Sequence, residues 1–79
     1  MLELKHDKEA DAVYILLDDK PYSYGKKVDK SRRVDYAQDG TAIGVEFLYV
    51  SDGVDVSDLP VEERAIGRLL EEHNLKVFA

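Results

Sequence analysis

The sequence contains no cysteine and no long hydrophobic run among its 79 residues. Without cysteine, disulfides and thiolate metal sites are excluded, which fits a reducing compartment. An apolar run of about 18 residues would be needed for a membrane-spanning helix. A charged segment leading into an apolar signal core is also missing. We therefore expect a cytoplasmic protein that neither spans a membrane nor is secreted.

Positive charge is also scarce, since eleven basic residues face seventeen acidic ones and the net charge is -6. This balance argues against nonspecific nucleic-acid binding, which depends on neutralising phosphates. A single domain of this size buries only about 60% of the surface of its unfolded chain, and such small domains often gain stability from a second copy. We expect a homodimer or a complex with a small basic protein, with no cofactor.

Most of the chain has the pattern of antiparallel strands. Alternation in residues 2–5 and the β-branched and aromatic run of residues 12–17 predict a first hairpin. Residues 26–30 predict a short or edge strand, and residues 32–37 alternate like a half-buried strand. We expect the long intervening segment around residues 18–25 to be a loop, because it contains Pro21 and Gly25.

The Asp39-Gly40 pair separates two strand-like runs and predicts a hairpin with a type I′ turn. The second run covers residues 42–50, and residues 54–56 are long enough for a short closing strand. Residues 1–56 should therefore form an antiparallel β-meander sheet of four or five strands.

The hydrophobic period then changes to that of an amphipathic helix within residues 58–74. Asp58 is the predicted N-cap, Pro60 fits the first turn, and Asn74 is the predicted C-terminal stop. We predict a single α+β domain over residues 1–79, in which this helix packs on one sheet face and residues 75–79 form a tail.

The strand at residues 42–50 is apolar on both faces, and one helix covers only one of them. A second subunit would cover the other face. Alternatively, the loop at residues 18–25 and the tail at residues 75–78 fold over it. The sequence leaves both arrangements open.

Glu46 is an acidic residue within this otherwise apolar strand, at the same strand parity as Gly44. A buried carboxylate is typical of acid–base sites, so Glu46, Asp11, Tyr14 and Gly44 form a candidate polar site. The structural alternative is that Glu46 accepts a hydrogen bond from Tyr14 or pairs with Arg33. We favour the structural role, and we assign no catalytic residue, because no second catalytic group is evident.

Basic residues interleave with tyrosines between residues 22 and 36, a combination that can bind single-stranded nucleic acid. The alternative is that the lysines protect an exposed edge strand from aggregation, and we favour this role. The histidines lack zinc-site spacing and the aspartates match no calcium loop, so no metal site is predicted. The candidate basic patch consists of Lys26, Lys27, Lys30, Arg32 and Arg33.

Several short blocks together resemble the bacterial and archaeal domain of unknown function 2283, DUF2283. They are Glu-Ala-Asp-Ala-Val-Tyr-Ile from residue 9, Val-Asp-Tyr from residue 34 ahead of Asp39-Gly40, Ile-Gly-Val-Glu-Phe from residue 43, and Leu59-Pro60. The similarity covers residues 4–60 and departs where residues 21–33 are lengthened. The resemblance implies a fold more than a function.

Some members of this family are encoded beside small toxin-like proteins, so the resemblance adds an antitoxin-like role as a hypothesis. We expect a non-catalytic protein-interaction module that binds itself or a small basic partner. The alternative is a small-ligand or catalytic pocket organised around Glu46.

Overall fold

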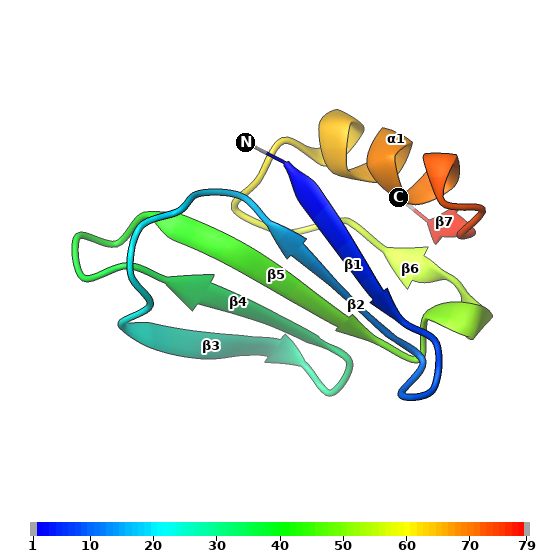
Figure 1. The fold of residues 1–79 in the computed structure, drawn as a ribbon, viewed down its shortest axis with the longest axis horizontal. Coiled ribbons are helices and arrows are strands. Elements are labelled where there is room, and N and C mark those ends of the chain that lie inside the picture. The colour runs from blue at the N-terminus through cyan, green and yellow to red at the C-terminus, as the bar shows by residue number, and fades with distance from the viewer. Residues whose placement is uncertain (1, 79) are drawn as a thin grey trace.

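The computed structural model describes residues 2–78 and contains a five-stranded antiparallel sheet, a two-stranded sheet and one α-helix (Figure 1). The predicted α+β class, with an antiparallel sheet followed by a C-terminal helix, is confirmed. None of the helices in residues 2–78 is long and apolar enough to cross a membrane. The elements are β1 (Glu3–Asp7), β2 (Ala12–Leu16), β3 (Tyr24–Asp29), β4 (Arg32–Tyr36), β5 (Ala42–Leu48), the 3-10 helix η1 (Val50–Asp52), β6 (Val54–Asp55), α1 (Glu63–Glu72) and β7 (Val77–Phe78).

The strand order of the large sheet is β1-β2-β5-β4-β3. Strands β3, β4 and β5 follow one another as in a meander, but β2 pairs with β5 instead of β3. The order therefore differs from that of a sequential meander. Strand β5 carries four buried residues and takes the central place, where it has a neighbour on both sides. The connection through residues 17–23 then crosses the end of the sheet to reach the far edge (Figure 1).

The turn between β4 and β5 lies where Asp39 and Gly40 predict it, but its geometry differs. The Ala37 N–H donates to the carbonyl of Thr41 (2.9 Å), and the Gly40 N–H donates to the carbonyl of Ala37 (3.0 Å), which closes a three-residue loop. Gly40 has a positive φ of 87°, whereas Asp39 does not. A type I′ turn needs positive φ at both central residues, so a type I turn followed by a glycine in the left-handed region fits better.

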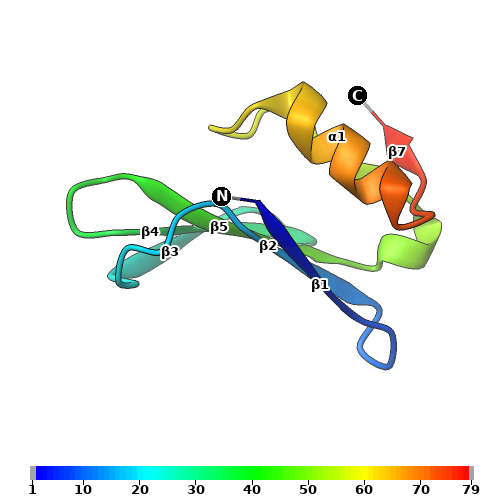
Figure 2. The same cartoon turned by 45° about the horizontal axis from the view of Figure 1, so that its top comes forward.

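One face of the large sheet forms the core together with α1. Val13 and Ile15 from β2, and Val45 and Phe47 from β5, are buried in one cluster with helix residues Ile66 and Leu70. Figure 2 shows α1 and the β6–β7 pair on the same side of the large sheet. No helix among residues 2–78 lies across its other side.

The segment at residues 54–56 does not close the large sheet as predicted. Its strand β6 instead pairs in parallel with β7, so that Val54 lies beside Val77. Val54 and Val56 are both buried in the core. The tail is therefore held on the helix side, which contradicts the alternative in which residues 75–78 fold over the second face; Ala79 lies outside the described residues.

Helix α1 begins later than predicted and ends where predicted. Asp58 is in a turn with a φ of 59°, and the N-cap position is Glu62, whose side chain makes no capping hydrogen bond. At the other end, Asn74 has a φ of 61°. The Leu75 N–H donates to the Leu70 carbonyl (3.1 Å), and the Asn74 N–H donates to the Glu71 carbonyl (3.0 Å). These bonds form a Schellman motif, with asparagine in the left-handed position.

Candidate functional site

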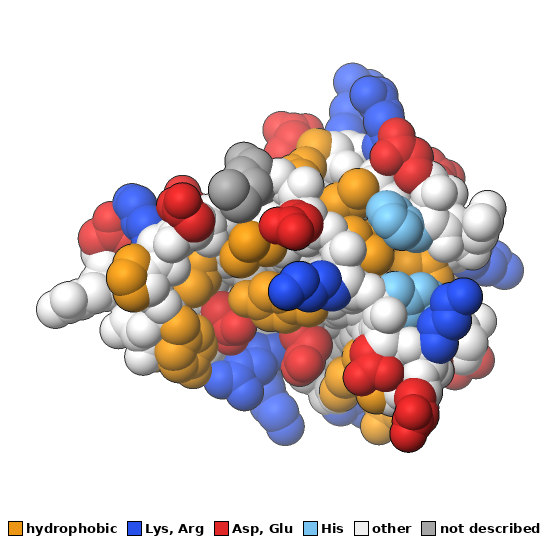
Figure 3. All heavy atoms as spheres, in the orientation of Figure 1, with side chains coloured by type: hydrophobic (Ala, Val, Ile, Leu, Met, Phe, Trp, Pro, Cys, Tyr) orange, Lys and Arg blue, Asp and Glu red, His pale blue; other side chains and the backbone are white. Residues whose placement is uncertain are grey.

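The sheet face turned away from α1, called the open face below, is covered by no helix within residues 2–78. Side chains alternate between the two faces of a strand. Because Val13 and Ile15 are in the core, Tyr14 and Leu16 lie on the open face, where both are half-buried. Figure 3 shows this face, with hydrophobic side chains lying between acidic and basic ones over β1, β2 and β5.

Strand register arranges the open face into two neighbouring rows that cross all five strands from β1 to β3. The first row is Lys5, Tyr14, Glu46, Arg33 and Lys27. The second row is Glu3, Leu16, Gly44, Asp35 and Gly25. Each row therefore brings together side chains from segments that are far apart in the sequence.

Tyr14 reaches across β5 to β4. Its hydroxyl donates to Asp35 Oδ2 at 3.0 Å, and its ring passes over Gly44, where a β-carbon would collide with the hydroxyl. Burial, and then the hydrogen bond to the Asp35 carboxylate, raise the pKa of Tyr14 to about 12. The hydroxyl therefore stays protonated at neutral pH and links β2 to β4.

Arg33 lies in the same way over a second glycine. A β-carbon on Gly25 would approach the Arg33 guanidinium to 2.5 Å. Arg33 Nη2 donates to the Tyr22 hydroxyl at 3.0 Å, and Arg33 Nε is 3.3 Å from Asp35 Oδ1. This contact is an ion pair that is not aligned as a hydrogen bond. Asp35 Oδ1 is therefore buried without a hydrogen-bond partner within residues 2–78.

Glu46 is half-buried between Tyr14 and Arg33 in the first row. It forms no hydrogen bond or ion pair with another described residue, which differs from the structural role predicted for it. Asp35, which the sequence reasoning did not single out, receives both contacts instead. Glu46 borders a hollow of about 370 Å³ with Lys5 and Tyr14, and a smaller one with Arg33 on its other side.

Asp11 does not join the other candidate residues. It has a φ of 54°, and its carboxylate accepts hydrogen bonds from the Ser51 N–H (3.0 Å) and the Ser51 hydroxyl (2.7 Å). It therefore ties the β1–β2 turn to η1 at the end of the sheet. Of the predicted polar site, the structure brings together Tyr14, Gly44 and Glu46.

The candidate basic patch is divided among different surfaces. Lys27 and Arg33 are on the open face, whereas Lys26 is opposite Val34 on the core side, with its ammonium 6.0 Å from the ring centre of Tyr36. Lys30 is exposed in the β3–β4 turn. These positions do not form one continuous cationic surface.

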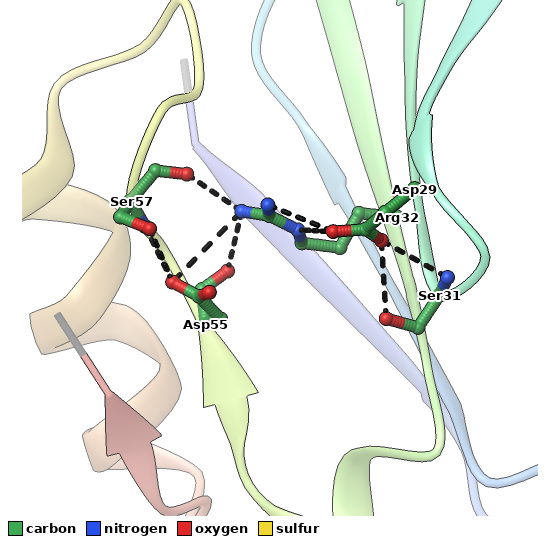
Figure 4. A network of polar contacts seen from close by, with 5 residues as sticks. All are labelled: Asp29, Ser31, Arg32, Asp55 and Ser57. Atoms are coloured by element: carbon green, nitrogen blue, oxygen red, sulfur yellow. Dashed lines mark hydrogen bonds and ion pairs between the residues drawn. The ribbon is translucent and has the colours of Figure 1, made fainter.

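Arg32 is buried, with only 8% of its surface exposed, and links the β3–β4 hairpin to β6 (Figure 4). Its Nε donates to Asp29 Oδ2 at 2.9 Å, and its Nη1 donates to the carbonyls of Asp55 (3.1 Å) and Ser57 (2.6 Å). Burial of the Asp29 carboxylate opposes its charge, but hydrogen bonds from Ser31 and Arg32 lower its pKa overall. Arg32 is therefore a structural residue.

Comparison with known proteins agrees with the resemblance found in the sequence. The family described as "Protein of unknown function (DUF2283)" has a model that matches residues 4–51, which is more than half of the chain. The match includes β2 to β5 and all of β1 except Glu3, and it ends before α1. No curated protein and no solved structure gives a match.

Proposed function

Because the chain belongs to the DUF2283 family, whose description assigns no activity, we propose from its own surface that it is a non-catalytic protein-interaction module. The open face of the sheet is the binding surface in this proposal. A single observation carries it: half-buried apolar side chains gather on a face that α1 leaves uncovered.

These apolar side chains come from two central strands. Ala12, Tyr14 and Leu16 on β2 lie beside Leu48 and Gly44 on β5. Removing apolar surface from water contributes about 25 cal/mol per Å². A partner that covers this part of the face therefore gains free energy without any rearrangement of the fold.

The polar groups of the open face favour binding over catalysis. Tyr14 keeps its proton because its pKa is about 12, and its hydroxyl donates a hydrogen bond to Asp35. Asp35 in turn lies beside the Arg33 guanidinium. A general acid or base needs a pKa near the working pH. The Tyr14–Asp35 pair is instead suited to holding neighbouring strands and side chains in fixed positions.

A small basic protein is a second class of partner for the module. The most specific version of this proposal is that the module neutralises a small basic protein as an antitoxin does. The supporting observation is the acidic segment at residues 52–63, which has no basic residue. Asp52, Asp58, Glu62 and Glu63 on this segment are exposed. Titration with a small basic protein at low salt should give a 1:1 complex; no binding under these conditions would contradict this partner class.

A small-ligand pocket at Glu46 is the alternative function. It is supported by the position of Glu46 between two hollows, without a hydrogen bond or ion pair from other described residues. In this case, Glu46→Gln should abolish ligand binding and spare the fold. A variant that merely loses stability would remove the support for the pocket.

The main proposal is tested by placing a charge in the apolar part of the open face. Tagged wild-type protein, Leu16→Lys and the control Val28→Lys are each incubated with native lysate and with an untagged copy of the chain. Val28 is 37% exposed on the edge strand β3 and not within the apolar group. We expect a stoichiometric partner bound to the open face to be retained by wild type and Val28→Lys and lost by Leu16→Lys. Retention by Leu16→Lys would contradict the proposed function.

A further inference from the structure

We propose that the partner of the open face is a second copy of the chain, related by a two-fold axis that crosses the strands between the first and second rows. This inference rests on the proposed function and names the occupant of the same surface. Such an axis lies between the two sheets, so that they pack face to face with their strands roughly aligned, as in β-sandwiches.

This axis places the first row of one copy over the second row of the other, strand by strand. Strand β1 then brings Lys5 opposite Glu3 of the second copy, and the symmetry repeats the same pair in reverse. On β2, Tyr14 comes opposite Leu16 of the second copy. The two rows therefore match in charge on the edge strand β1, and apolar side chains meet on the neighbouring strand β2.

The charge of the two rows differs from that of the whole chain. The rows contain three acidic and three basic side chains and are neutral, although the chain carries a net charge of -6. Two copies would repel each other through most of their surfaces. The two rows are a region where they can meet without this repulsion, and the charged residues of the rows are Glu3, Asp35, Glu46, Lys5, Lys27 and Arg33.

Neither Glu3 nor Lys5 forms an ion pair with any residue between 2 and 78, and both are exposed. They are therefore free to pair with another molecule. The opposite end of the rows is less favourable, because Lys27 comes opposite Gly25 of the second copy, over which Arg33 lies. The attraction lies at β1, β2 and β4, where Arg33 comes opposite Asp35 of the second copy, and the β3 edge brings two cations together.

The size of the open face is sufficient for a weak dimer. Five strands about 4.8 Å apart and about 17 Å long cover roughly 400 Å² in projection, before side-chain relief is counted. Specific interfaces bury about 800 Å² on each partner, and weaker encounters bury less. Association should therefore be followed up to concentrations of about 1 mM, the upper end of the range of weak affinities.

The test exchanges the charges of the predicted pair and follows association by sedimentation equilibrium. Lys5→Glu places two acidic residues opposite each other at both symmetric contacts, and Glu3→Lys places two basic residues there. We expect each variant to weaken self-association about tenfold, since exposed pairs contribute up to about 1 kcal/mol each and 1.4 kcal/mol is tenfold. The two variants shift the net charge in opposite directions, which separates pairing from bulk charge.

A mixture of the two variants provides the sharpest readout. Because each chain then supplies the charge that the other lacks, we expect a heterodimer close to wild-type affinity. Lys27→Glu should strengthen association severalfold, since it faces the guanidinium over Gly25. The control Lys30→Glu makes the same charge change as Lys5→Glu in an exposed turn outside the rows and should leave association unchanged.

Three outcomes would overturn this inference: a wild-type protein that stays monomeric at about 1 mM, single variants that associate like wild type, or single variants whose mixture does not recover. If wild type stays monomeric and captures a lysate protein that Leu16→Lys does not capture, only the assignment of a second copy as the partner is overturned. The proposed function would then stand. Capture that survives Leu16→Lys would overturn the proposed function itself.

Discussion

Two glycines on the open face give room to side chains that cross to neighbouring strands. Tyr14 lies over Gly44 and Arg33 lies over Gly25. Both long side chains therefore lie along the sheet and meet at Asp35, which accepts the Tyr14 hydrogen bond. A glycine in a strand often marks such a close approach.

The role of Gly44 can be isolated with a double-mutant cycle of Gly44→Ala and Tyr14→Leu. Alanine should gain about 0.5–1 kcal/mol over glycine through the unfolded state, but it displaces Tyr14 from Asp35 and loses a hydrogen bond of about 1 kcal/mol. We therefore predict that Gly44→Ala stabilises the Tyr14→Leu background and is neutral or destabilising in wild type. Urea unfolding of the four proteins measures the difference. Equal effects in both backgrounds would exclude the contact.

Tyr14 should also make stability dependent on alkaline pH. Its pKa in the folded chain is about 12, above its ordinary value near 10, so folding favours the protonated hydroxyl. The stability that this provides is complete below about pH 10 and is lost as the pH rises through about 12. We predict that the stability advantage of wild type over Tyr14→Phe decreases across this interval. A constant difference in urea unfolding would contradict it.

Arg32 should be the charged residue on which stability depends most. Its guanidinium is buried and donates hydrogen bonds to the Asp29 carboxylate and to the carbonyls of Asp55 and Ser57. Removing one member of a buried pair costs about 3–5 kcal/mol, and because Asp29 is partly exposed we expect about 2 kcal/mol for Arg32→Met. The matched control Lys30→Met lies in an exposed turn and should change the unfolding free energy by less than about 0.5 kcal/mol. Equal losses in the two variants would contradict a bridging role.

At the scale of elements, the end of α1 is fixed by one backbone conformation. Asn74 has a φ of 61°, which glycine adopts without strain and a β-branched residue does not. We predict that Asn74→Gly is neutral or up to about 1 kcal/mol more stable, and that Asn74→Val is about 1–2 kcal/mol less stable. A loss of this size lowers the melting temperature of a small domain by roughly 4–8 °C per kcal/mol. Equal melting temperatures for the two variants would contradict the Schellman end.

The elements themselves follow from hydrophobic periods, whereas their arrangement does not. Period-two alternation marks β1 and β4, runs of apolar residues mark β2 and β5, and the change to a helical period marks α1. The pairing of β2 with β5 depends on a contact across the whole length of β3 and β4, which no local pattern encodes. Strand β7 has only two residues, too few for any period, so its pairing with β6 could not be predicted.

The candidate residues likewise divide into those that the sequence pattern identifies and those whose roles depend on how the strands are arranged. Glu46 and Gly44 are conspicuous as polar and small residues in an apolar strand, and Tyr14 follows from strand parity. Asp35 becomes the acceptor for Tyr14 only through the register of three strands. The burial of Arg32 could not be predicted from the sequence either, because Arg32 stands near exposed lysines and carries the same charge as they do.

At the scale of the whole molecule, one sheet divides the chain into a closed and an open side. α1, β6 and β7 lie over the core side (Figure 2), and the two rows with their neutral charge lie on the other. In our proposal, this small acidic domain combines a surface that repels other copies with one that accepts a partner. The proposed binding role rests on this division.

The measurement that tests this division most directly follows the methyl NMR signals of Leu16 and Leu48 in the presence of a soluble paramagnetic agent. Both side chains are on the open face, and Val28 on β3 provides an exposed reference outside their apolar group. As the protein concentration rises, we predict that Leu16 and Leu48 become protected from the agent while Val28 stays accessible. Leu16 and Leu48 signals that remain equally broadened at every concentration would contradict a binding role of the open face in self-association.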